Sequence, residues 1–421
     1  MPAAPPFRSQ FLRTFVERGA YYDCSAPDDL DELFAKECVT AYIGFDCTAT
    51  SMHIGNLVQL MTLRRLQQTG HRPILLMGGG TTKAGDPSGK DETRLILSPE
   101  QIQENKQSML NGVKHLLKFG EGSTDAIMVD NAEWLDKLEY IPFLREVGKH
   151  FSVNRMLTMD SVRLRLEREQ PMSFLEFNYS IMQAYDYVEL YKRYGCRLQS
   201  SGSDQWGNVV SGIDLGRRLA GVQLFALSTP LITTASGAKM GKSVSGAVWL
   251  NKDMLSVYDY WQFWRNTEDA DVGRFLRLFT DLPLEEIAVY EKLKGQEINE
   301  AKKRLATEAT AILHGKDAAA RAEATAKETF EEGTSSEGLP SLDVSASELA
   351  TGIPLFELLR RAGLAESGSA ARRLIKGGGA RINDAQASDD AVVLSDKDVS
   401  AQGHIKISAG RKKHVLVRPV K

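Results

Sequence analysis

The sequence predicts an α/β chain in which a parallel β-sheet with connecting helices is followed by an α-helical segment and a small basic domain. Short apolar runs at 41–45 and 73–77 end near glycine and are followed or flanked by helical periodicity, which is typical of parallel βαβ units. From about Asp253 to Thr329 the apolar spacing becomes helical. Residues 331–340 are polar and rich in Gly and Ser, as linkers are. We therefore expect domains at 1–235, 236–330 and 352–421, with a linker over 331–351.

The composition is that of an ordinary soluble protein. The chain has 421 residues, of which 42% are hydrophobic and 25% charged, enough for two or three domains. No stretch approaches the roughly 20 apolar residues of a membrane span, and the first residues contain no apolar signal-peptide core. The four cysteines are scattered, without a Cys-x-x-Cys pair or a His/Cys cluster. These features predict a cytoplasmic protein in a reducing compartment, with no membrane contact and no structural zinc.

Charge is distributed unevenly along the chain. Residues 352–421 hold 13 Lys and Arg against 7 Asp and Glu, a net charge of +6, whereas the preceding 351 residues hold 39 against 48, a net charge of −9. A basic module on an acidic body suggests a polyanionic partner at the C-terminal end. Charge alone fits a merely solvated surface equally well.

Two short motifs far apart in the sequence both suit phosphate groups. His53-Ile-Gly-Asn56 follows a predicted strand and loop and opens a helix, and a helix N-terminus after a strand is an anion site. Lys239-Met-Gly-Lys-Ser243 places two lysines beside a glycine, on a loop that can close over a polyphosphate. Each motif alone is a weak signal. Together they favour a site where fixed donors stabilise charge that develops on phosphate oxygens.

Two further segments have polar residues after predicted strands. Gly85-Asp-Pro-Ser-Gly-Lys90 is not a P-loop, because three residues rather than four separate its glycines and Asp91 occupies the Ser/Thr position. In Gly202-Ser-Asp-Gln-Trp-Gly-Asn208, the carboxylate of Asp204 suits a pair of ribose hydroxyls. An ordinary Ser-Asp helix cap without a ligand explains this second motif about as well.

Polar side chains also line one face of a predicted helix. Ser173-Phe-Leu-Glu176 fits a capping box, so we expect a helix to begin there and to continue through Asp186. Tyr179, Gln183 and Asp186 then fall at i, i+4 and i+7 on one face. A phenol, an amide and a carboxylate would be costly in a core without partners, and a binding pocket supplies partners. A solvated polar stripe is the alternative on spacing alone.

Together these motifs resemble the HIGH and KMSKS signatures of class I aminoacyl-tRNA synthetases and, more closely, the tyrosyl-tRNA synthetase family of bacterial and organellar type. The resemblance extends from about residue 10 to the C-terminus. It implies a Rossmann-like parallel sheet in the catalytic domain, an α-helical domain and a small α+β RNA-binding domain. The segments that carry it are Tyr42-Ile-Gly-Phe-Asp-Cys-Thr, His53-Ile-Gly-Asn, Gly85-Asp-Pro-Ser-Gly-Lys, Phe151-Ser-Val-Asn, Tyr179 through Asp186, Gly202-Ser-Asp-Gln-Trp-Gly-Asn and Lys239-Met-Gly-Lys-Ser.

The resemblance implies roles for the residues that match the motifs. The tyrosine site would consist of Tyr42, Asp46, Asp86, Asn131, Tyr179, Gln183, Asp186 and Gln205. Tyr42 and Asp186 would bind the phenol, and other members of this set the α-ammonium and the carboxyl group. The phosphates and the reaction would be served by Thr48, His53, Asn56, Lys90, Arg94, Lys239, Lys242 and Ser243. Further nucleotide contacts would come from Gly55, Gly202, Asp204 and Lys242.

Three positions depart from the commonest pattern of the family. Asn56 stands in place of the last His of the HIGH motif, and its amide can still donate a hydrogen bond, so we keep the site but expect altered nucleotide contacts. Ile43 stands where a polar cysteine often lies near the ribose, and we expect no contact there. Ser201 replaces a frequent second glycine, which implies a tighter loop.

The C-terminal segment 353–383 is similar to a small RNA-binding module that pseudouridine synthases share with a ribosomal protein. The similarity implies that basic side chains of the tail lie along tRNA phosphates. These side chains are Arg372, Arg373, Lys376, Arg411, Lys412 and Lys413. A surface-charged packing or dimer module is the alternative.

The resemblance implies an enzyme that activates L-tyrosine with ATP to tyrosyl-adenylate and transfers tyrosine to the 3′ end of tRNA(Tyr). No cofactor would be bound permanently, and Mg²⁺ would accompany the substrate ATP. A homodimer is expected from the resemblance alone.

Two other functions stay open at this point. A tryptophanyl-tRNA synthetase is disfavoured by the pair Tyr42 and Asp186, because an indole N–H only donates and needs no donor in return. An RNA-binding or splicing paralogue without catalysis is disfavoured by the intact His53, Lys239 and Asp204.

Overall fold

The computed structural model describes residues 4–88, 97–237, 240, 242–243, 246–330, 339–400, 402–410 and 413–420. Five residues with roles implied above lie outside these ranges, namely Lys90, Arg94, Lys239, Arg411 and Lys412. The chain divides into two compact units. Unit 1 comprises Met1–Leu255 and Asn266–Gly315, and unit 2 comprises Ser256–Arg265 and Lys316–Lys421.

Unit 1 is built on a six-stranded sheet with the order β1-β6-β5-β2-β3-β4. Strands β2 to β6 pair in parallel, and β1 pairs antiparallel with β6 at one edge. The bounds are β1 Asp23–Cys24, β2 Thr40–Asp46, β3 Arg72–Gly78, β4 Ile127–Asp130, β5 Leu198–Gly202 and β6 Phe225–Thr229. The predicted parallel α/β architecture is confirmed. Because the strand order reverses between β2 and β5, ligands are expected beyond the carboxyl ends of these two strands.

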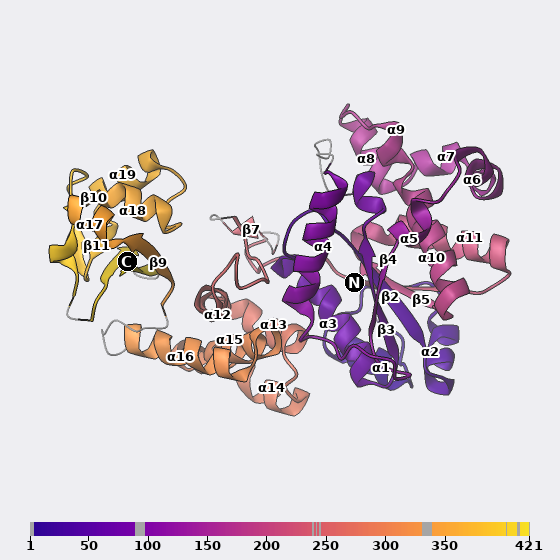
Figure 1. The fold of residues 1–421 in the computed structure, drawn as a ribbon. Coiled ribbons are helices and arrows are strands. Elements are labelled where there is room, and N and C mark those ends of the chain that lie inside the picture. Colours follow the sequence, from indigo (N-terminus) through magenta and orange to yellow (C-terminus); the bar gives the residue numbers. More distant parts are fainter. Residues whose placement is uncertain are drawn as a thin grey trace. The chain divides into compact units, whose positions relative to one another are not determined.

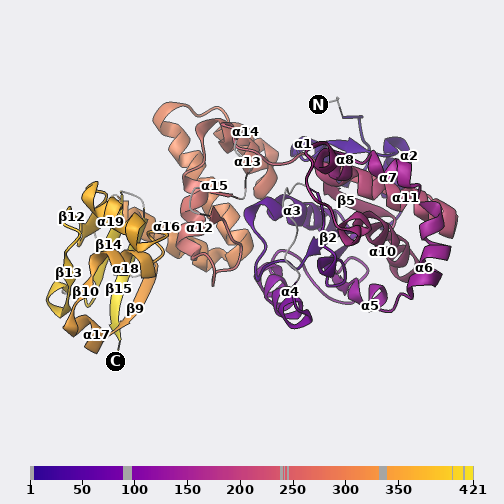
Figure 2. The same cartoon turned by 90° about the horizontal axis from the view of Figure 1, so that it is seen from above.

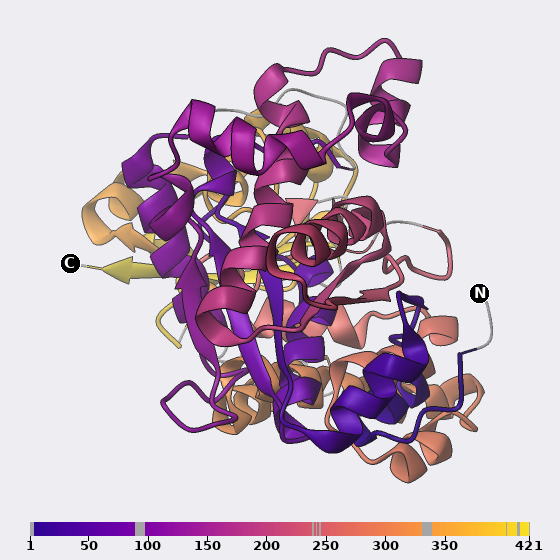
Figure 3. The ribbon, with the colours of Figure 1, turned by 90° about the vertical axis from the view of Figure 1, so that its right-hand side faces the viewer.

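Helices cover both faces of the sheet, with α3 and α4 on one face and α10 and α11 on the other (Figure 1 and Figure 2). Figure 3 shows α10 and α11 in front of the violet strands. The bounds are α1 Gln10–Glu17, α2 Pro27–Lys36, α3 Ile54–Gln68, α4 Pro99–Val113, α5 Ala132–Leu135, α6 Tyr140–Glu146, α7 Val153–Leu157, α8 Asp160–Glu167, α9 Phe174–Phe177, α10 Tyr179–Tyr194 and α11 Trp206–Ala220. Burial on both faces explains why the central strands β2 and β3 read as continuous apolar runs.

The capping box predicted at Ser173 is confirmed, but the helix that it starts is short. Ser173 Oγ accepts a hydrogen bond from Glu176 N at 3.1 Å, and Glu176 Oε2 accepts one from Ser173 N at 2.9 Å. Helix α9 ends at Phe177, and α10 begins at Tyr179. The prediction of one helix from the capping box through Asp186 was therefore wrong. Both the backbone N–H of Asn178, at 3.1 Å, and its side-chain amide, at 2.7 Å, donate to the Phe174 carbonyl, so the interruption is confined to this one residue.

The helical spacing predicted from Asp253 to Thr329 is confirmed. The helices are α12 Val257–Arg265, α13 Val272–Phe279, α14 Leu284–Tyr290, α15 Ile298–His314 and α16 Lys316–Phe330. Helices α13 to α15 belong to unit 1, and α12 and α16 belong to unit 2. In the described part of the chain, no helix is both long enough and apolar enough to cross a bilayer.

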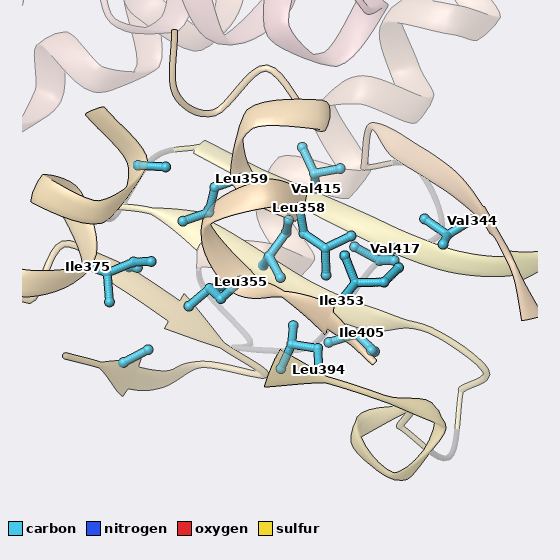
Figure 4. Close-up of a cluster of buried hydrophobic side chains, with 14 of the residues drawn as sticks. Val344, Ile353, Leu355, Leu358, Leu359, Ile375, Leu394, Ile405, Val415 and Val417 are labelled. Carbon is cyan, nitrogen blue, oxygen red and sulfur yellow. The ribbon is translucent and has the colours of Figure 1, made fainter. Parts of the chain in front are cut away.

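The C-terminal part of unit 2 has a five-stranded sheet with the order β12-β11-β14-β15-β9 and a separate pair, β10 with β13. The bounds are β9 Ser341–Ser345, α17 Ala346–Thr351, β10 Ile353–Pro354, α18 Leu355–Arg361, α19 Gly368–Lys376, β11 Ala380–Ile382, β12 Ala385–Ala387, β13 Val393–Leu394, β14 Ile405–Ala409 and β15 Lys413–Val420. Figure 4 shows its core, where Leu358 of α18 and Ile375 of α19 pack with Ile405 and Val417 of the sheet.

This core reaches further upstream than the sequence indicated. Val344 of β9 and Leu349 of α17 are buried members of the same cluster. Strand β9 also pairs in parallel with β15, the last strand of the chain. Residues 341–351, which were expected in the linker, are thus part of the folded tail.

Candidate active site

The predicted site residues gather at the carboxyl edge of the sheet, where β2 and β5 end. Asp46 is the last residue of β2, and Gly202 is the last residue of β5. His53 begins α3 after the loop that follows β2, and Asp204 lies exposed in the turn after β5. Thr48 lies exposed in the loop that leads to His53. Residues distant in sequence therefore meet at the switch point of the sheet, where ligands of such folds bind.

His53 is the N-cap of α3, and its own backbone fixes how the ring is protonated. Nδ1 of His53 accepts a hydrogen bond from Gly55 N at 3.0 Å, while His53 N donates to Asn56 Oδ1 at 3.1 Å. With Nδ1 as acceptor, the neutral imidazole carries its proton on Nε2. Asn56 uses its oxygen in this reciprocal cap, so its amide nitrogen keeps its capacity to donate.

Gly55 is the point where the two signature segments touch. A Cβ atom on Gly55 would lie 2.8 Å from His53 Cε1 and 3.1 Å from the carbonyl oxygen of Met240, so no side chain fits there. The chain after Met240 forms a short hairpin of β7 Lys242–Ser243 and β8 Gly246–Ala247. Only the backbone of Lys242 and Ser243 is described.

An antiparallel pairing then fixes the end of this segment to the start of α3. Ile54 N donates to the Val248 carbonyl at 2.8 Å, and Leu250 N donates to the Met52 carbonyl at 2.9 Å. The Lys-containing segment is thus joined directly to the residues on either side of His53.

Asp186 and Tyr42 form a buried polar pair inside the sheet–helix layer. Trp134 Nε1 donates to Asp186 Oδ1 at 2.7 Å, and Asn131 Nδ2 donates to Asp186 Oδ2 at 2.9 Å. Burial raises the pKa of Asp186 to about 8, and these two hydrogen bonds offset only part of that rise. Burial and the nearby Asp186 raise the pKa of Tyr42 well above its ordinary value, so Tyr42 stays a neutral phenol.

The hydroxyl of Tyr42 lacks what a buried hydroxyl normally has. It is inaccessible to water and has no hydrogen-bond partner among the described residues. Buried polar groups are nearly always paired, and an exception of this kind points to a ligand. A ligand hydroxyl placed here could accept from Tyr42 and donate to Asp186.

A continuous chain of hydrogen bonds connects this pair to the end of β2. The second N–H of the Asn131 amide donates to Thr81 Oγ1 at 3.0 Å, and Thr81 in turn donates to Asp46 Oδ1 at 2.8 Å. Tyr179 donates to Asp46 Oδ2 at 3.0 Å. Burial and the charge of Asp46 raise the pKa of Tyr179 well above its ordinary value, so it acts as a neutral donor.

A second polar group lies around Asp86. Its Oδ1 accepts from Ser88 N at 2.8 Å, and its Oδ2 accepts from Gln205 Nε2 at 2.8 Å. Asn208 Nδ2 donates to Gln205 Oε1 at 3.0 Å and to Gln183 Oε1 at 3.1 Å. A carboxylate and two amide oxygens held in this way form an acceptor-rich group that suits an ammonium ion.

Sequence analysis gave no role to Thr81, Trp134 or Asn208. Trp134 lies three residues after Asn131, on the short helix α5 that follows β4. A tryptophan at this place, just beyond a strand of the parallel sheet, was the one signal that could have identified it. Nothing in the sequence shows that Thr81 bridges the Asn131 amide, just after β4, to the Asp46 carboxylate at the end of β2.

A cavity of about 630 Å³ borders the predicted ribose residue Asp204. Its other wall includes the basic side chains of Arg155, Arg165 and Arg168. Arg165 forms a buried ion pair with Glu176 at 3.1 Å. The cavity therefore offers both polar and cationic walls next to the nucleotide end of the site.

A buried Tyr–Asp pair and a helix N-terminus beyond the carboxyl end of a parallel strand suit a class I aminoacyl-tRNA synthetase for an aromatic amino acid. Comparison with known families places the chain in this class. Residues 35–331 match the family described as tRNA synthetases class I (W and Y), and the chain belongs to this family. Residues 329–417 match the Tyrosine–tRNA ligase SYY-like C-terminal domain.

Individual relatives agree with this assignment. A tyrosine–tRNA ligase of Nitrobacter winogradskyi is 60% identical over 413 residues, which is 98% of this chain and 99% of the relative. One of Rhodospirillum rubrum is 60% identical over 411 residues, 98% of each chain. Among solved structures, a C-terminally truncated mitochondrial tyrosyl-tRNA synthetase of Aspergillus nidulans has a TM-score of 0.69 and 32% identity, covering 77% of this chain and 95% of that chain.

Stability should depend on pH through Asp186. Because its pKa is about 8 in the folded chain against an ordinary 3.8, the folded protein between these values holds a proton that the unfolded chain has released. Below about pH 4 the Asp186 carboxyl group is protonated in both the folded and the unfolded state, so its ionisation costs no stability. Above about pH 8 it is ionised in both states, and the full cost of burying its charge is present. The free energy of unfolding of the unmodified protein should therefore fall as pH rises, relative to that of the Asp186→Asn variant. Urea unfolding of both proteins from about pH 5 to about pH 9 measures this difference. Parallel pH profiles would contradict the raised pKa.

Proposed function

We propose that this chain is a tyrosine–tRNA ligase, which activates L-tyrosine with ATP and transfers the tyrosyl group to the 3′ end of tRNA(Tyr). The observation that carries the proposal is the buried pair of Asp186, with two fixed donors, and Tyr42, with an unpaired hydroxyl. A phenol completes both, because it donates and accepts. An indole N–H would leave the Tyr42 hydroxyl unpaired, which disfavours tryptophan. Relatives with the name tyrosine–tRNA ligase, 60% identical over almost the whole chain, support the same substrate.

The rest of the tyrosine molecule is proposed to extend from this pair toward the carboxyl edge of the sheet. Its α-ammonium would bind among Asp86, Gln183 and Tyr179, where carboxylate and amide oxygens converge. Asp46 adds a negative charge on the same side and holds the Tyr179 hydroxyl in place. With both ends of tyrosine fixed, its carboxylate would face the start of α3, where the nucleotide is proposed to lie.

Adenylate formation is proposed to rest on positioning and on charge stabilisation, without a covalent nucleophile. The tyrosine carboxylate attacks the α-phosphorus of ATP, and pyrophosphate leaves. His53, with its proton on Nε2, would donate to phosphate oxygens, helped by the N-terminal end of α3. Lys239 and Lys242 would offset the charge on the leaving pyrophosphate. Mg²⁺ is proposed to arrive with ATP, bound mainly by phosphate oxygens and water.

The tRNA is proposed to use two places on the chain. The cavity beside Asp204 would accommodate its 3′ end, with the arginines on the cavity wall near its phosphates. On helix α19 of the tail, Arg373 is exposed and has no ion pair among the described residues, whereas Arg372 and Lys376 pair with Asp390 at 3.5 and 3.2 Å. RNA phosphates would therefore bind Arg373 directly and replace Asp390 at the other two.

A homodimer is proposed on the basis of exposed apolar side chains. Eight of the fifteen large apolar side chains that are exposed in the described residues belong to four consecutive helices, α6 to α9. They are Tyr140, Ile141, Val153, Leu157, Leu164, Leu166, Phe174 and Leu175. Figure 1 shows these helices gathered in one region of unit 1. Such an apolar patch is a typical protein interface, and we propose a second copy of this chain as its partner.

A cytoplasmic location is also proposed. All four cysteines are unpaired, which suits a reducing compartment, and three of them are buried.

The unmodified protein should catalyse tyrosine-dependent ATP–pyrophosphate exchange and reject phenylalanine. A site that pairs a phenol leaves buried polar groups unpaired when the hydroxyl is missing, a principle for which tyrosyl-tRNA synthetases are the reference example. Asp186→Ala should nearly abolish adenylate formation, and Tyr42→Phe should reduce discrimination by one hydrogen bond, about 0.5–1.5 kcal/mol. Exchange assays with each amino acid measure both effects. Equal activation of tyrosine and phenylalanine by the unmodified protein would refute the proposal.

A chain that ends at Gly338 should fold and still form tyrosyl-adenylate, because the core of the tail is separate and includes only residues beyond that point. Transfer to tRNA should fall steeply, since phosphate contacts supply much of the affinity for RNA. Arg373→Glu in the full chain should weaken tRNA binding without affecting pyrophosphate exchange, whereas Lys397→Glu, an exposed cation elsewhere in the tail, should have little effect. Normal charging by the shortened chain at moderate salt would show that the tail is structural.

Phe174→Glu should convert the proposed dimer into a monomer, because it places a charge at the most exposed apolar side chain of α6 to α9. Light scattering at several protein concentrations measures the mass. Val289→Glu on α14 is the matched control, since Val289 is 60% exposed and Phe174 66% exposed, but only Phe174 lies on α6 to α9. A monomeric unmodified protein, or equal dissociation by both variants, would refute this interface.

A further inference from the structure

Helix α13 contacts the segment that leads to Lys239. Asp271, at the N-terminal end of α13, accepts a hydrogen bond from Ala235 N on its Oδ2 atom at 2.7 Å. Arg274, one turn further along, donates to the Thr233 carbonyl and also to Asp271 Oδ1 at 2.6 Å. The stem 233–235, a few residues before Lys239, is therefore held by two side chains of a helix that is distant in sequence.

The carboxylate of Asp271 does not serve its own helix. Asp271 occupies the N-cap position of α13 but makes no capping hydrogen bond with its side chain. The residue is only 3% exposed, so its charge is removed from water. A buried carboxylate is costly unless it is paired, and both oxygens of Asp271 are used by the stem and by Arg274. Its burial is therefore explained by the stem rather than by helix capping.

The other end of α13 is tied to the helix that carries His53. Arg64 and Arg65, near the C-terminal end of α3, both bind the carboxylate of Asp281 just after α13, with Arg64 Nε at 3.0 Å from Oδ2. Arg65 also donates to the Thr280 carbonyl at the C-terminal end of α13. Burial would raise the pKa of Asp281, but the hydrogen bonds and charges of the two arginines hold it well below its ordinary value.

Between its two ends, α13 is held in place by the burial of one face. Val272, Phe275, Leu276 and Phe279 are buried along one face. One helix therefore connects α3, with His53 at its start, to the stem of the segment that carries the two lysines. Both connections are made by charged hydrogen bonds, which are the strong ones.

We propose that Asp271 is a positioning residue for adenylate formation, which holds the stem 233–235 so that Lys239 and Lys242 meet the same phosphates as His53. This rests on the proposed function, because it assigns those lysines to the pyrophosphate. Among the described residues, the side-chain hydrogen bonds of Asp271 are to Ala235 and Arg274, neither of which belongs to the proposed tyrosine site. Its loss should therefore slow the chemical step and leave tyrosine binding unchanged.

The test compares Asp271→Ala, Asp271→Asn and Asp269→Asn in the full-length protein. Asp269 is exposed and lies two residues from Asp271, and among the described residues its ion pair is with Lys302 rather than with the stem, so its variant controls for the loss of one negative charge. Single-turnover formation of tyrosyl-adenylate gives the rate constant, and tyrosine titration without ATP gives the dissociation constant. Asp271→Ala should lower the rate constant by about tenfold or more while the dissociation constant changes by less than about twofold.

Asp271→Asn keeps one oxygen for Ala235 N but loses the charge that faces Arg274, so its rate constant should fall between those of Ala and of the unmodified protein. It is also the variant to use if Asp271→Ala does not fold. An unchanged rate constant in both variants would overturn the proposal. So would a parallel loss of rate and of tyrosine affinity, because that is the result of general unfolding. An unmodified protein without tyrosine-dependent exchange would instead refute the proposed function itself.

Discussion

The burial of the Asp186 carboxyl group is the constraint on which the rest of the site depends. A carboxylate removed from water is tolerated only when its oxygens are paired, and the pairing here needs Trp134 and Asn131 in fixed positions. Asn131 in turn can donate to Asp186 only while its oxygen accepts from Gly80 N at 2.7 Å and its second N–H reaches Thr81. Asp186 is therefore supported by two segments, 80–81 and 131–134, and a change in either of them alters its environment.

The same buried groups that the proposed function uses to bind tyrosine lower the free energy of unfolding of the protein. The raised pKa of Asp186 means that ionising this group, to which the proposed function assigns recognition of tyrosine, destabilises the protein. The unpaired hydroxyl of Tyr42 is a second unfavourable feature. Both are relieved by one ligand group that donates and accepts hydrogen bonds. A bound phenol would therefore pair both buried groups of the protein and its own hydroxyl. A phenyl ring, which has no hydroxyl, would leave both groups unpaired.

The sequence was sufficient for features that depend on local pattern. Burial on both faces made β2 and β3 continuous apolar runs, and the capping box at Ser173 marked a real helix start. It was insufficient where the outcome depends on tertiary partners. Whether one helix or two cover 174–194 is not marked in the local pattern, and the structure ends α9 at Phe177 and starts α10 at Tyr179.

The resemblance to a known family gave more of the site than residue patterns could. It grouped Tyr42, Asp86 and Asp186, which come from separate elements, and in the structure Asp186 lies near Tyr42 while both Asp86 and Asp186 lie near Tyr179. It omitted residues such as Trp134, which orients the side chain of Asp186 through a hydrogen bond. The tail shows the same limit, since β9 lies in a segment that is polar in composition and gains its fold only by pairing with β15.

The order of side chains along the sheet edge matches the order of charges in the proposed substrates. At the deep end, burial raises the pKa of Asp186 to about 8, and the phenol of the substrate is proposed to lie beside it. Next come the carboxylates of Asp46 and Asp86, where an ammonium would lie. At the outer end, His53 and the start of α3 present donors, where phosphates would lie. Tyrosine in the reverse orientation would place its phenol among the carboxylates of Asp46 and Asp86. Its charged ammonium and carboxylate groups would then lie at the buried Asp186 and Tyr42, where burying a charge is costly. The arrangement of charges therefore favours the proposed orientation, in which the carboxylate of tyrosine would face the α-phosphate.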